Sequence, residues 1–189
     1  MKLAPVIFIV GPSGVGKDAA CGWIKTQYNF VHVDIDEPGH FEAKGLQSHW
    51  NRLKKLDPNL LASALRDRAS VANAVGVVIS LPSDKVIMPE MGKAAEAVGV
   101  FTLVLWGTPE ACKRARMGRD GSVKDTCDQK NRKAIATYSL PEFADSQVEV
   151  FGADGYHLPH DQVKGLIRDR LARCYESPHF REWTRIEFN

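Results

Sequence analysis

Seven residues near the start of the chain, GPSGVGK, have the types and the spacing of a loop that binds phosphate groups. They match the pattern G-x-x-x-x-G-K, in which glycines let backbone N–H groups converge on phosphate oxygens while the lysine reaches the phosphoryl group that is transferred. A glycine-rich turn with an exposed lysine is the alternative. The predicted phosphate-binding residues are Gly11, Pro12, Ser13, Gly14, Val15, Gly16 and Lys17.

The residues on either side of this loop favour the phosphate-binding interpretation. The apolar run 6–10 predicts a strand that leads directly into the loop, and residues 18–28 predict a helix that leaves it. Phosphates held there lie at a helix N-terminus, where unpaired N–H groups and the helix dipole favour anions. The sequence therefore predicts a nucleotide-phosphate site in which Lys17 is catalytic.

Two carboxylates follow the second predicted strand. Asp34 and Asp36 stand two residues apart at the end of the run 30–34, so an extended backbone points both side chains the same way. Because ligands bind at the carboxyl ends of parallel strands, both are expected beside the phosphate loop. The pair suits holding Mg²⁺ and accepting a hydroxyl proton, and the alternative is a pair of turn or capping carboxylates.

A strongly basic segment lies between residues 113 and 133. It holds eight basic and three acidic side chains, a net charge of +5, although the whole chain has a net charge of only +2. Arg116 and Arg119 are one helical turn apart, and Arg132 lies near the end of the segment. Arginines in such a segment can stabilise the charge of phosphoryl transfer, while a solvated basic helix face is the alternative.

The elements that must position these residues alternate along the chain. Short apolar runs at 6–10, 30–34, 75–80, 101–106 and 148–151 predict five strands, separated by longer amphipathic stretches. Asp57-Pro58 and Thr108-Pro109 each predict a helix start with an N-cap and a proline at the first helical position. Leu60, Leu61, Ala64, Leu65 and Ala69, and later Val163, Leu166, Ile167 and Leu171, form apolar helix stripes. The predicted class is α/β with one parallel sheet covered on both faces.

Composition sets the broad class. With 189 residues, 44% hydrophobic and 25% charged, the chain is expected to be one soluble globular domain. The four cysteines lie far apart and form neither a zinc motif nor a disulfide framework, which favours a reducing cytoplasm. No apolar run is long enough to cross a bilayer, and the small net charge predicts no nucleic-acid partner. A monomer or a homodimer is expected.

On these residues the chain resembles the P-loop kinases, the small α/β phosphotransferases that include nucleoside monophosphate kinases, shikimate kinase and gluconate kinase. The phosphate loop corresponds to their Walker A motif. The resemblance implies the three-layer P-loop NTPase fold, with a five-stranded parallel sheet and a helical lid, here about residues 113–137. It covers a single kinase domain at residues 1–176 and leaves residues 177–189 as a C-terminal tail.

The resemblance also implies roles for individual residues. The families have Ser or Thr after the lysine, as a Mg²⁺ ligand, where this chain has Asp18; a carboxylate is still a hard oxygen ligand, and G-K-D is similar to variants in other kinase families. Asp34 and Asp36 are similar to the D-x-D pair of shikimate kinase, and Arg52 falls where that enzyme binds its substrate carboxylate. Residues 152–155 correspond to the loop against adenine.

The expected function is therefore a Mg²⁺-dependent transfer of the γ-phosphoryl group of ATP to a hydroxyl of a small, anionic metabolite. Asp18 and Asp34 are the expected metal ligands, and Asp36 the acceptor-side carboxylate. Lys17, Asp34, Asp36, Arg116 and Arg119 are the predicted catalytic residues, Arg132 a nucleotide contact, and Asp36 and Arg52 the substrate contacts. The alternatives are a nucleoside or deoxynucleoside monophosphate kinase, and a nucleotide-binding regulator without turnover.

Overall fold

A computed structural model describes residues 2–35, 45–121 and 125–187, with the side chains of residues 120 and 125–128 left out. Five parallel strands form one sheet in the order β2-β3-β1-β4-β5. These strands are β1 (Val6–Val10), β2 (Phe30–Asp34), β3 (Gly76–Ser80), β4 (Val100–Trp106) and β5 (Gln147–Glu149). The predicted α/β class and parallel sheet are confirmed.

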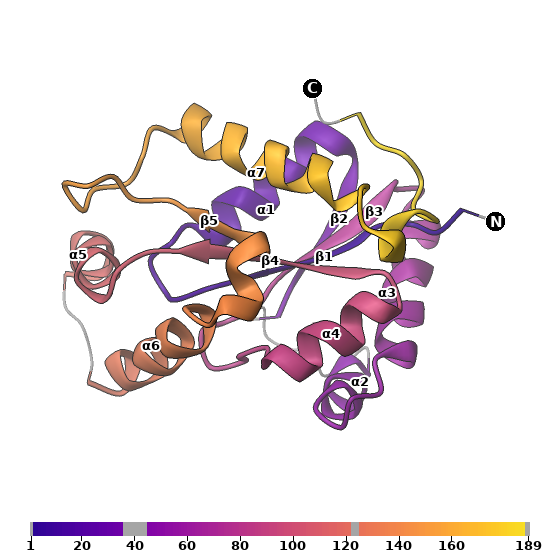
Figure 1. Ribbon diagram of the computed structural model, residues 1–189, viewed down its shortest axis with the longest axis horizontal. Coiled ribbons are helices and arrows are strands. Elements are labelled where there is room, and N and C mark those ends of the chain that lie inside the picture. Colours follow the sequence, from indigo (N-terminus) through magenta and orange to yellow (C-terminus); the bar gives the residue numbers. More distant parts are fainter. Residues whose placement is uncertain (1, 36–44, 122–124, 188–189) are drawn as a thin grey trace.

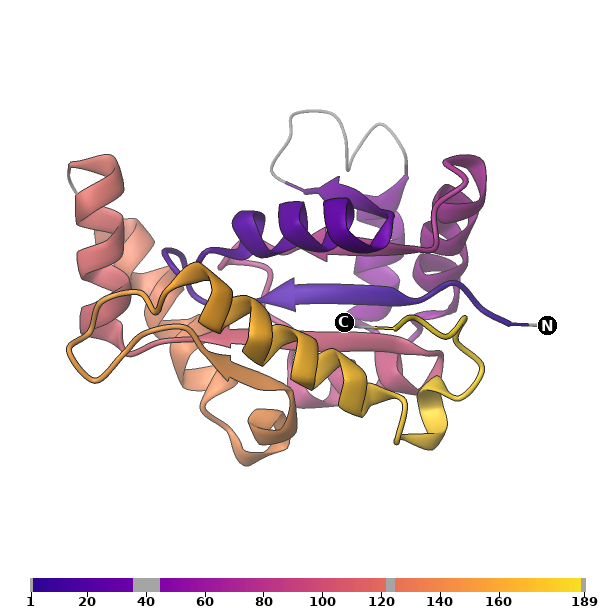
Figure 2. The ribbon, with the colours of Figure 1, turned by 90° about the horizontal axis from the view of Figure 1, so that it is seen from above.

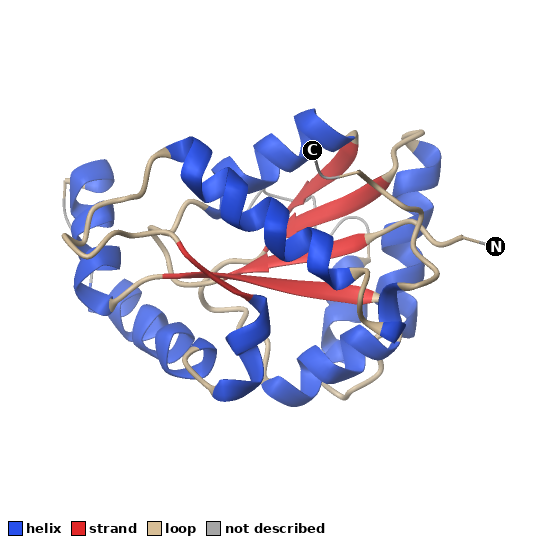
Figure 3. Cartoon of the chain, turned by 45° about the horizontal axis from the view of Figure 1, so that its top comes forward, coloured by secondary structure: helices blue, strands red, loops and turns tan. Residues whose placement is uncertain are grey.

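Helices cover both faces of the sheet (Figures 1 and 3). In Figure 1, α1 (Lys17–Tyr28) and α7 (His160–Cys174) lie above the strands, with α4 (Pro89–Ala97) and α6 (Asp125–Tyr138) below. The helices α2 (Leu46–Leu53) and α3 (Asn59–Val71) share the face of α4. The helix α5 (Pro109–Asp120) stands beyond the tip of β1, whose arrow in Figure 2 points away from the N-terminus.

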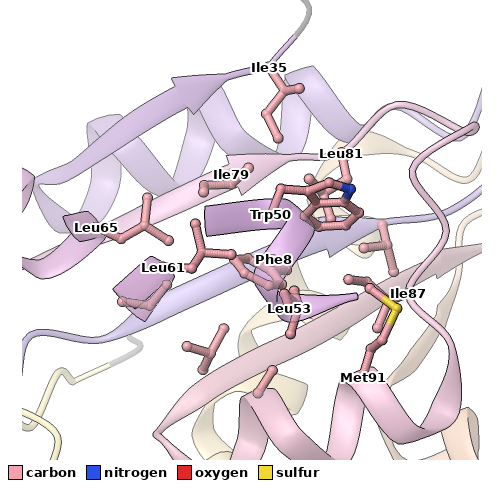
Figure 4. Packing of buried hydrophobic residues seen from close by; sticks show 14 of the residues in the cluster. Phe8, Ile35, Trp50, Leu53, Leu61, Leu65, Ile79, Leu81, Ile87 and Met91 are labelled. Carbon is pink, nitrogen blue, oxygen red and sulfur yellow. The ribbon is translucent and has the colours of Figure 1, made fainter. Parts of the chain in front are cut away.

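The apolar residues of the strands explain this layering. All five residues of β1 are buried, and alternate ones face opposite sides of the sheet. Phe8 packs with Trp50 and Leu53 of α2 and with Leu65 of α3 (Figure 4). Ile7 and Ile9 face the other core, which α1 and α7 complete. The middle strand is thus fixed from both sides, and with it the point where the phosphate loop begins.

Two local predictions were wrong for identifiable reasons. The predicted strand 148–151 ends at Glu149 because Phe151 pairs antiparallel with His157, which turns the chain back. The predicted N-cap Asp57 does not cap α3; its carboxylate instead accepts hydrogen bonds from Arg52, which lower its pKa below the ordinary value. The Thr108 prediction is confirmed, since its hydroxyl accepts a hydrogen bond from the N–H of Ala111 at 3.2 Å.

Most of the two predicted apolar stripes faces the core, but Leu60 and Leu166 are exposed. Leu61, Leu65 and Leu171 are buried. Leu60 stands at the second position of α3, and Leu166 precedes the buried Ile167 on α7. Each predicted apolar stripe therefore included one residue that lies outside the buried face of its helix.

The C-terminal segment packs on the body of the domain through the short helix η2 (Pro178–Phe180) and Trp183. Both Phe180 and Trp183 are 1% exposed, and the indole N–H of Trp183 donates to the carbonyl oxygen of Gly99 at 3.0 Å. Backbone hydrogen bonds join Leu3 to the residues on either side of Trp183. These aromatic residues complete the core on the α7 side of the sheet.

Within the described ranges, no helix is both long and apolar enough to span a membrane.

Candidate functional site

The phosphate loop, residues 11–17, leaves β1 and turns into α1 through three glycines with positive φ angles. These angles are 143° at Gly11, 96° at Gly14 and 82° at Gly16, a region that L side chains rarely adopt. A Cβ atom on Gly11 would lie 2.2 Å from the carbonyl oxygen of Leu105 on the neighbouring strand β4. The loop therefore needs glycine both for its conformation and for its close approach to β4.

The helix α5 packs directly behind the loop at Gly14. A Cβ atom there would lie 2.8 Å from the carbonyl oxygen of Cys112 and 3.2 Å from Cγ of Arg116. Gly14 occupies one of the variable positions of the motif, so the motif does not show its requirement for glycine, which comes from its φ of 96° and from the close packing of α5.

The side chain of Lys17, the lysine of the motif, folds back onto the phosphate loop. The Nζ atom of Lys17 donates to the carbonyl oxygens of Gly11 at 3.1 Å and of Pro12 at 3.0 Å. A cleft of about 360 Å³ opens beside it and is lined by Ser13, Gly14, Gly16, Lys17, Asp18, Ala19, Ser80, Leu81, Pro82, Ser83 and Arg119. The loop after β1 and the loop after β3 thus form its two walls.

One predicted carboxylate lines this cleft, and a second ends the strand beside it. Asp18 is exposed in the first turn of α1 and lines the cleft, and Asp34 ends β2 in register with Ser80 of β3. Burial raises the pKa of the Cys21 thiol well above its ordinary value, and both carboxylates act in the same direction. Asp18 therefore borders the cleft directly, and Asp34 stands beside Ser80, which lines it. Asp36 lies outside the described residues.

Ser80 links the cleft to a histidine that no sequence motif indicates as a site residue. Its hydroxyl lies 3.3 Å from Nε2 of His32 on β2. His32 and Asp34 alternate with the core residues Val31 and Val33, so they share the face of β2 toward α1. The strand pattern alone would have placed these two residues together, but only the register of β2 with β3 brings Ser80 to them.

The four arginines predicted as site residues lie in different places in the structure. Arg119 is exposed and lines the cleft, whereas Arg116 is 3% exposed and lies behind Gly14. Arg132 is exposed on α6 and is not among the residues that line the cleft. Arg52 is held by Asp57, through hydrogen bonds from Nε at 2.9 Å and from Nη2, in the turn between α2 and α3. Of the four, the structure brings Arg119 alone to the cleft.

Asn131 of α6 contacts the phosphate loop directly. Its Oδ1 accepts a hydrogen bond from the N–H of Ser13 at 2.7 Å, and its Nδ2 donates to the carbonyl oxygen of Ser13 at 3.3 Å. No local sequence pattern indicates this contact, because 118 residues separate the partners. Further along α6, Ala134, within the predicted lid, and Tyr138, just after it, are buried in the core.

A second, more apolar pocket adjoins the cleft. It has a volume of about 200 Å³ and shares Gly16 and Ala19 with the cleft. Its other walls come from Val15 and from α1, α7 and the residues before α7, namely Ala20, Trp23, Val150, His157, Leu158, His160, Val163, Lys164 and Ile167. The predicted adenine loop, residues 152–155, turns next to it, and Arg114 donates to the carbonyl oxygen of Asp154 at 3.0 Å.

Comparison with solved structures identifies the fold. A gluconokinase from Sinorhizobium meliloti 1021 superimposes with a TM-score of 0.56 at 16% identity, covering 96% of this chain and 99% of that chain. The chain has the P-loop kinase fold. A shikimate kinase from Acinetobacter baumannii, in complex with shikimate, superimposes with a TM-score of 0.52 at 15% identity, covering 91% of this chain and 96% of that chain. No protein-family model and no curated protein matches the sequence.

The P-loop kinase fold explains where the candidate site lies. In open α/β sheets, ligands bind at the carboxyl ends of the strands where the chain order reverses. Here β1 continues through α1 to β2, while its neighbours in the sheet are β3 and β4. The loop after β1 leads to α1 on one face of the sheet, and the loop after β3 leads to α4 on the other face. The two loops therefore diverge, and the cleft lies between them.

Proposed function

We propose that the protein binds ATP with Mg²⁺ in the cleft and transfers the γ-phosphoryl group to a hydroxyl of a small, anionic metabolite. The observation that carries the proposal is the phosphate loop. Three glycines with positive φ angles turn it around the N-terminus of α1, and its lysine borders a cleft of about 360 Å³. Unpaired N–H groups at a helix N-terminus attract anions, and this geometry fits a triphosphate.

The pocket beside the cleft supports a nucleotide rather than a free phosphate. It is mostly apolar, contains the rings of Trp23 and His157, and meets the cleft at Gly16 and Ala19. A flat base suits such a pocket, because aromatic and aliphatic walls bury its faces. The guanidinium of Arg114 lies over the ring of Tyr156 at 5.0 Å, next to the loop predicted to contact adenine. The two pockets together fit a base joined to a chain of phosphates.

The carboxylates of the cleft fit a magnesium ion. Asp18 lies on the cleft wall, and Asp34 is level with Ser80, which lines it. Mg²⁺ takes one or two carboxylates and completes its six ligands with water and phosphate oxygens. Bound with ATP, the ion would neutralise phosphate charge.

The remaining roles follow from position. Lys17 can exchange its hydrogen bonds to Gly11 and Pro12 for phosphate oxygens, since all three lie in the loop. Arg119 extends from α5 into the cleft and can stabilise negative charge as the phosphoryl group moves. Asp36 is proposed to accept the hydroxyl proton. Arg52 and Arg132 stay predictions as substrate and nucleotide contacts.

The test is an assay of ADP release over a panel of acceptors. The panel contains gluconate and other sugar acids, shikimate-like acids, polyols and nucleoside monophosphates, since the fold is shared with a gluconokinase and a shikimate kinase. Ser80, Leu81, Pro82 and Ser83 stand where shikimate kinases carry glycines, which argues against shikimate itself. Turnover with nucleoside monophosphates alone would favour a monophosphate kinase, and ATP binding without turnover a regulator.

Lys17→Ala provides the control for any activity found. The activity should fall about 100-fold or more, because the lysine contacts the transferred charge. Lys25→Ala removes an exposed lysine from the last turn of the same helix and should leave the activity unchanged. A Lys17 variant as active as the wild type would refute the phosphate-site assignment.

A further inference from the structure

We propose that Asn131 is a positioning residue for the phosphate loop and that α6 braces the cleft through it. The inference rests on the proposed function, because it concerns how the loop is prepared to receive phosphate. Asn131 is 4% exposed and bonds both backbone groups of Ser13 with the two ends of one carboxamide. An asparagine can accept and donate in this way at once, whereas an aspartate or an alanine cannot.

The loop needs such support because of its own composition. Ser13 lies between Gly11 and Gly14, two residues with positive φ angles that leave the backbone many alternatives when nothing holds it. Hydrogen bonds to the N–H and the carbonyl of Ser13, the residue between them, restrict that freedom. The buried position of Asn131 also keeps water from replacing the two hydrogen bonds.

Neighbouring residues of α6 contact the loop after β3, whose first residues line the opposite wall of the cleft. Tyr138 is buried, and its hydroxyl accepts a hydrogen bond from the N–H of Ile87 at 3.0 Å. The Nζ atom of Lys130 lies 2.9 Å from Oδ2 of Asp84, the residue that follows the cleft-lining segment 80–83. One helix thus contacts the loop after β1 and the loop after β3. The Lys130 pair is exposed and contributes little, so the buried contacts of Asn131 and Tyr138 carry the brace.

A brace of this kind lowers the entropy that the loop loses when phosphate binds. Its removal should therefore weaken ATP binding more than it slows the chemical step. For Asn131→Ala we expect the Kd of Mg-ATP to rise about tenfold, which corresponds to the typical contribution of a hydrogen bond. The value of kcat at saturating ATP should change by less than about threefold.

The experiment compares wild type, Asn131→Ala and Asn131→Asp with Gln129→Ala as the matched control. Gln129→Ala removes a carboxamide from an exposed position of the same helix. Two quantities are measured in each protein: the affinity for Mg-ATP by calorimetry, and the hydrogen-exchange rate of the Ser13 amide without nucleotide. Asn131→Ala should speed exchange at Ser13 and weaken ATP binding, and Gln129→Ala should change neither.

Asn131→Asp separates the two hydrogen bonds and guards against a failure of the alanine variant to fold. The carboxylate still accepts from the Ser13 N–H, so its exchange should stay slow, but it cannot donate to the carbonyl and places a negative charge behind the loop. ATP binding should weaken, more so at low salt. Unchanged ATP affinity in this variant overturns the inference.

The outcomes distinguish this inference from the proposed function. If the wild type does not bind Mg-ATP, the proposed function fails, and exchange at Ser13 still decides whether Asn131 holds the loop. If the wild type binds Mg-ATP and Asn131→Ala binds it equally well with unchanged exchange at Ser13, the inference is wrong while the proposed function stands.

Discussion

Arg116 packs behind Gly14 of the phosphate loop, with its Cγ atom 3.2 Å from the position that a Cβ on Gly14 would occupy. The carbonyl oxygen of Cys112, one turn earlier in α5, is closer still to that position. The first turns of α5 therefore support the loop from behind, and Arg119, one turn later, reaches the cleft in front. Two arginines on one helix thus occupy different environments.

The first prediction follows from this difference. Arg119→Ala should lower kcat about 100-fold with little change in thermal stability, because under the proposed function its exposed guanidinium stabilises charge that develops in the cleft. Arg116→Ala should lower the free energy of unfolding by about 2 kcal/mol, because it removes a buried side chain that packs behind the loop. Steady-state kinetics and thermal unfolding of both variants separate the effects. A loss confined to KM in Arg119→Ala would make that residue a ground-state nucleotide contact.

The second prediction concerns Asp18, which stands where related motifs have a hydroxyl. A carboxylate on the cleft wall repels uncomplexed triphosphate but can ligate Mg²⁺, so ATP affinity should fall sharply when a chelator removes the metal. Asp18→Ser should bind metal-free ATP more tightly relative to Mg-ATP and should keep its turnover with Mg²⁺. Calorimetric titration with and without chelator measures both.

A matched control for Asp18→Ser is Asp67→Ser, which removes an exposed carboxylate from α3. This control should show the metal dependence of the wild type. Equal ATP affinity with and without chelator in the wild type and in Asp18→Ser would mean that the Asp18 carboxylate faces away from the phosphates.

The third prediction concerns the C-terminal segment. Trp183→Ala should destabilise the protein by about 3 to 5 kcal/mol, because it empties a buried site and leaves the carbonyl of Gly99 without its indole donor. Arg181→Ala, an exposed change two residues earlier, should have an effect within about 0.5 kcal/mol. Urea denaturation measures both. Equal stability of the two variants would show that the segment does not contribute to the core in solution.

The fourth prediction is a pH dependence that arises from Cys112. Burial raises the pKa of its thiol from 9.0 to about 11, so the folded state keeps the proton over a range in which the unfolded chain releases it. The thiol therefore contributes its full stability below the unfolded pKa, and this contribution is lost as the pH rises toward 11. The loss should be on the order of 2 kcal/mol.

Cys112→Ala should remove this part of the alkaline loss of stability. Cys21 and Cys174, whose pKa values burial also raises, are present in both proteins and cancel in the comparison. The free energies of unfolding are compared at about pH 8 and about pH 10.5, on either side of the unfolded pKa. A stability difference between wild type and variant that stays constant over this range would contradict the assignment.

Local sequence patterns predicted the alternation of strands and helices and the phosphate loop. Strand 6–10 is apolar throughout, as is typical of a strand covered on both faces. The glycines and the lysine that follow it mark the phosphate loop by their spacing alone. The start of α5 was also predictable, because the Thr108 hydroxyl caps the helix by accepting a hydrogen bond from the N–H of Ala111, only three residues later. Each of these features depends on interactions within a few residues, which spacing and residue type express directly.

The tertiary structure decided which distant residues share the site. Asn131 meets Ser13 across 118 residues, and Arg116 and Arg119 have the same type and nearly the same position but face opposite sides of the loop. Sequence spacing carries no information on such contacts, because they depend on how helices pack across the sheet and not on the order of residues within any one of them.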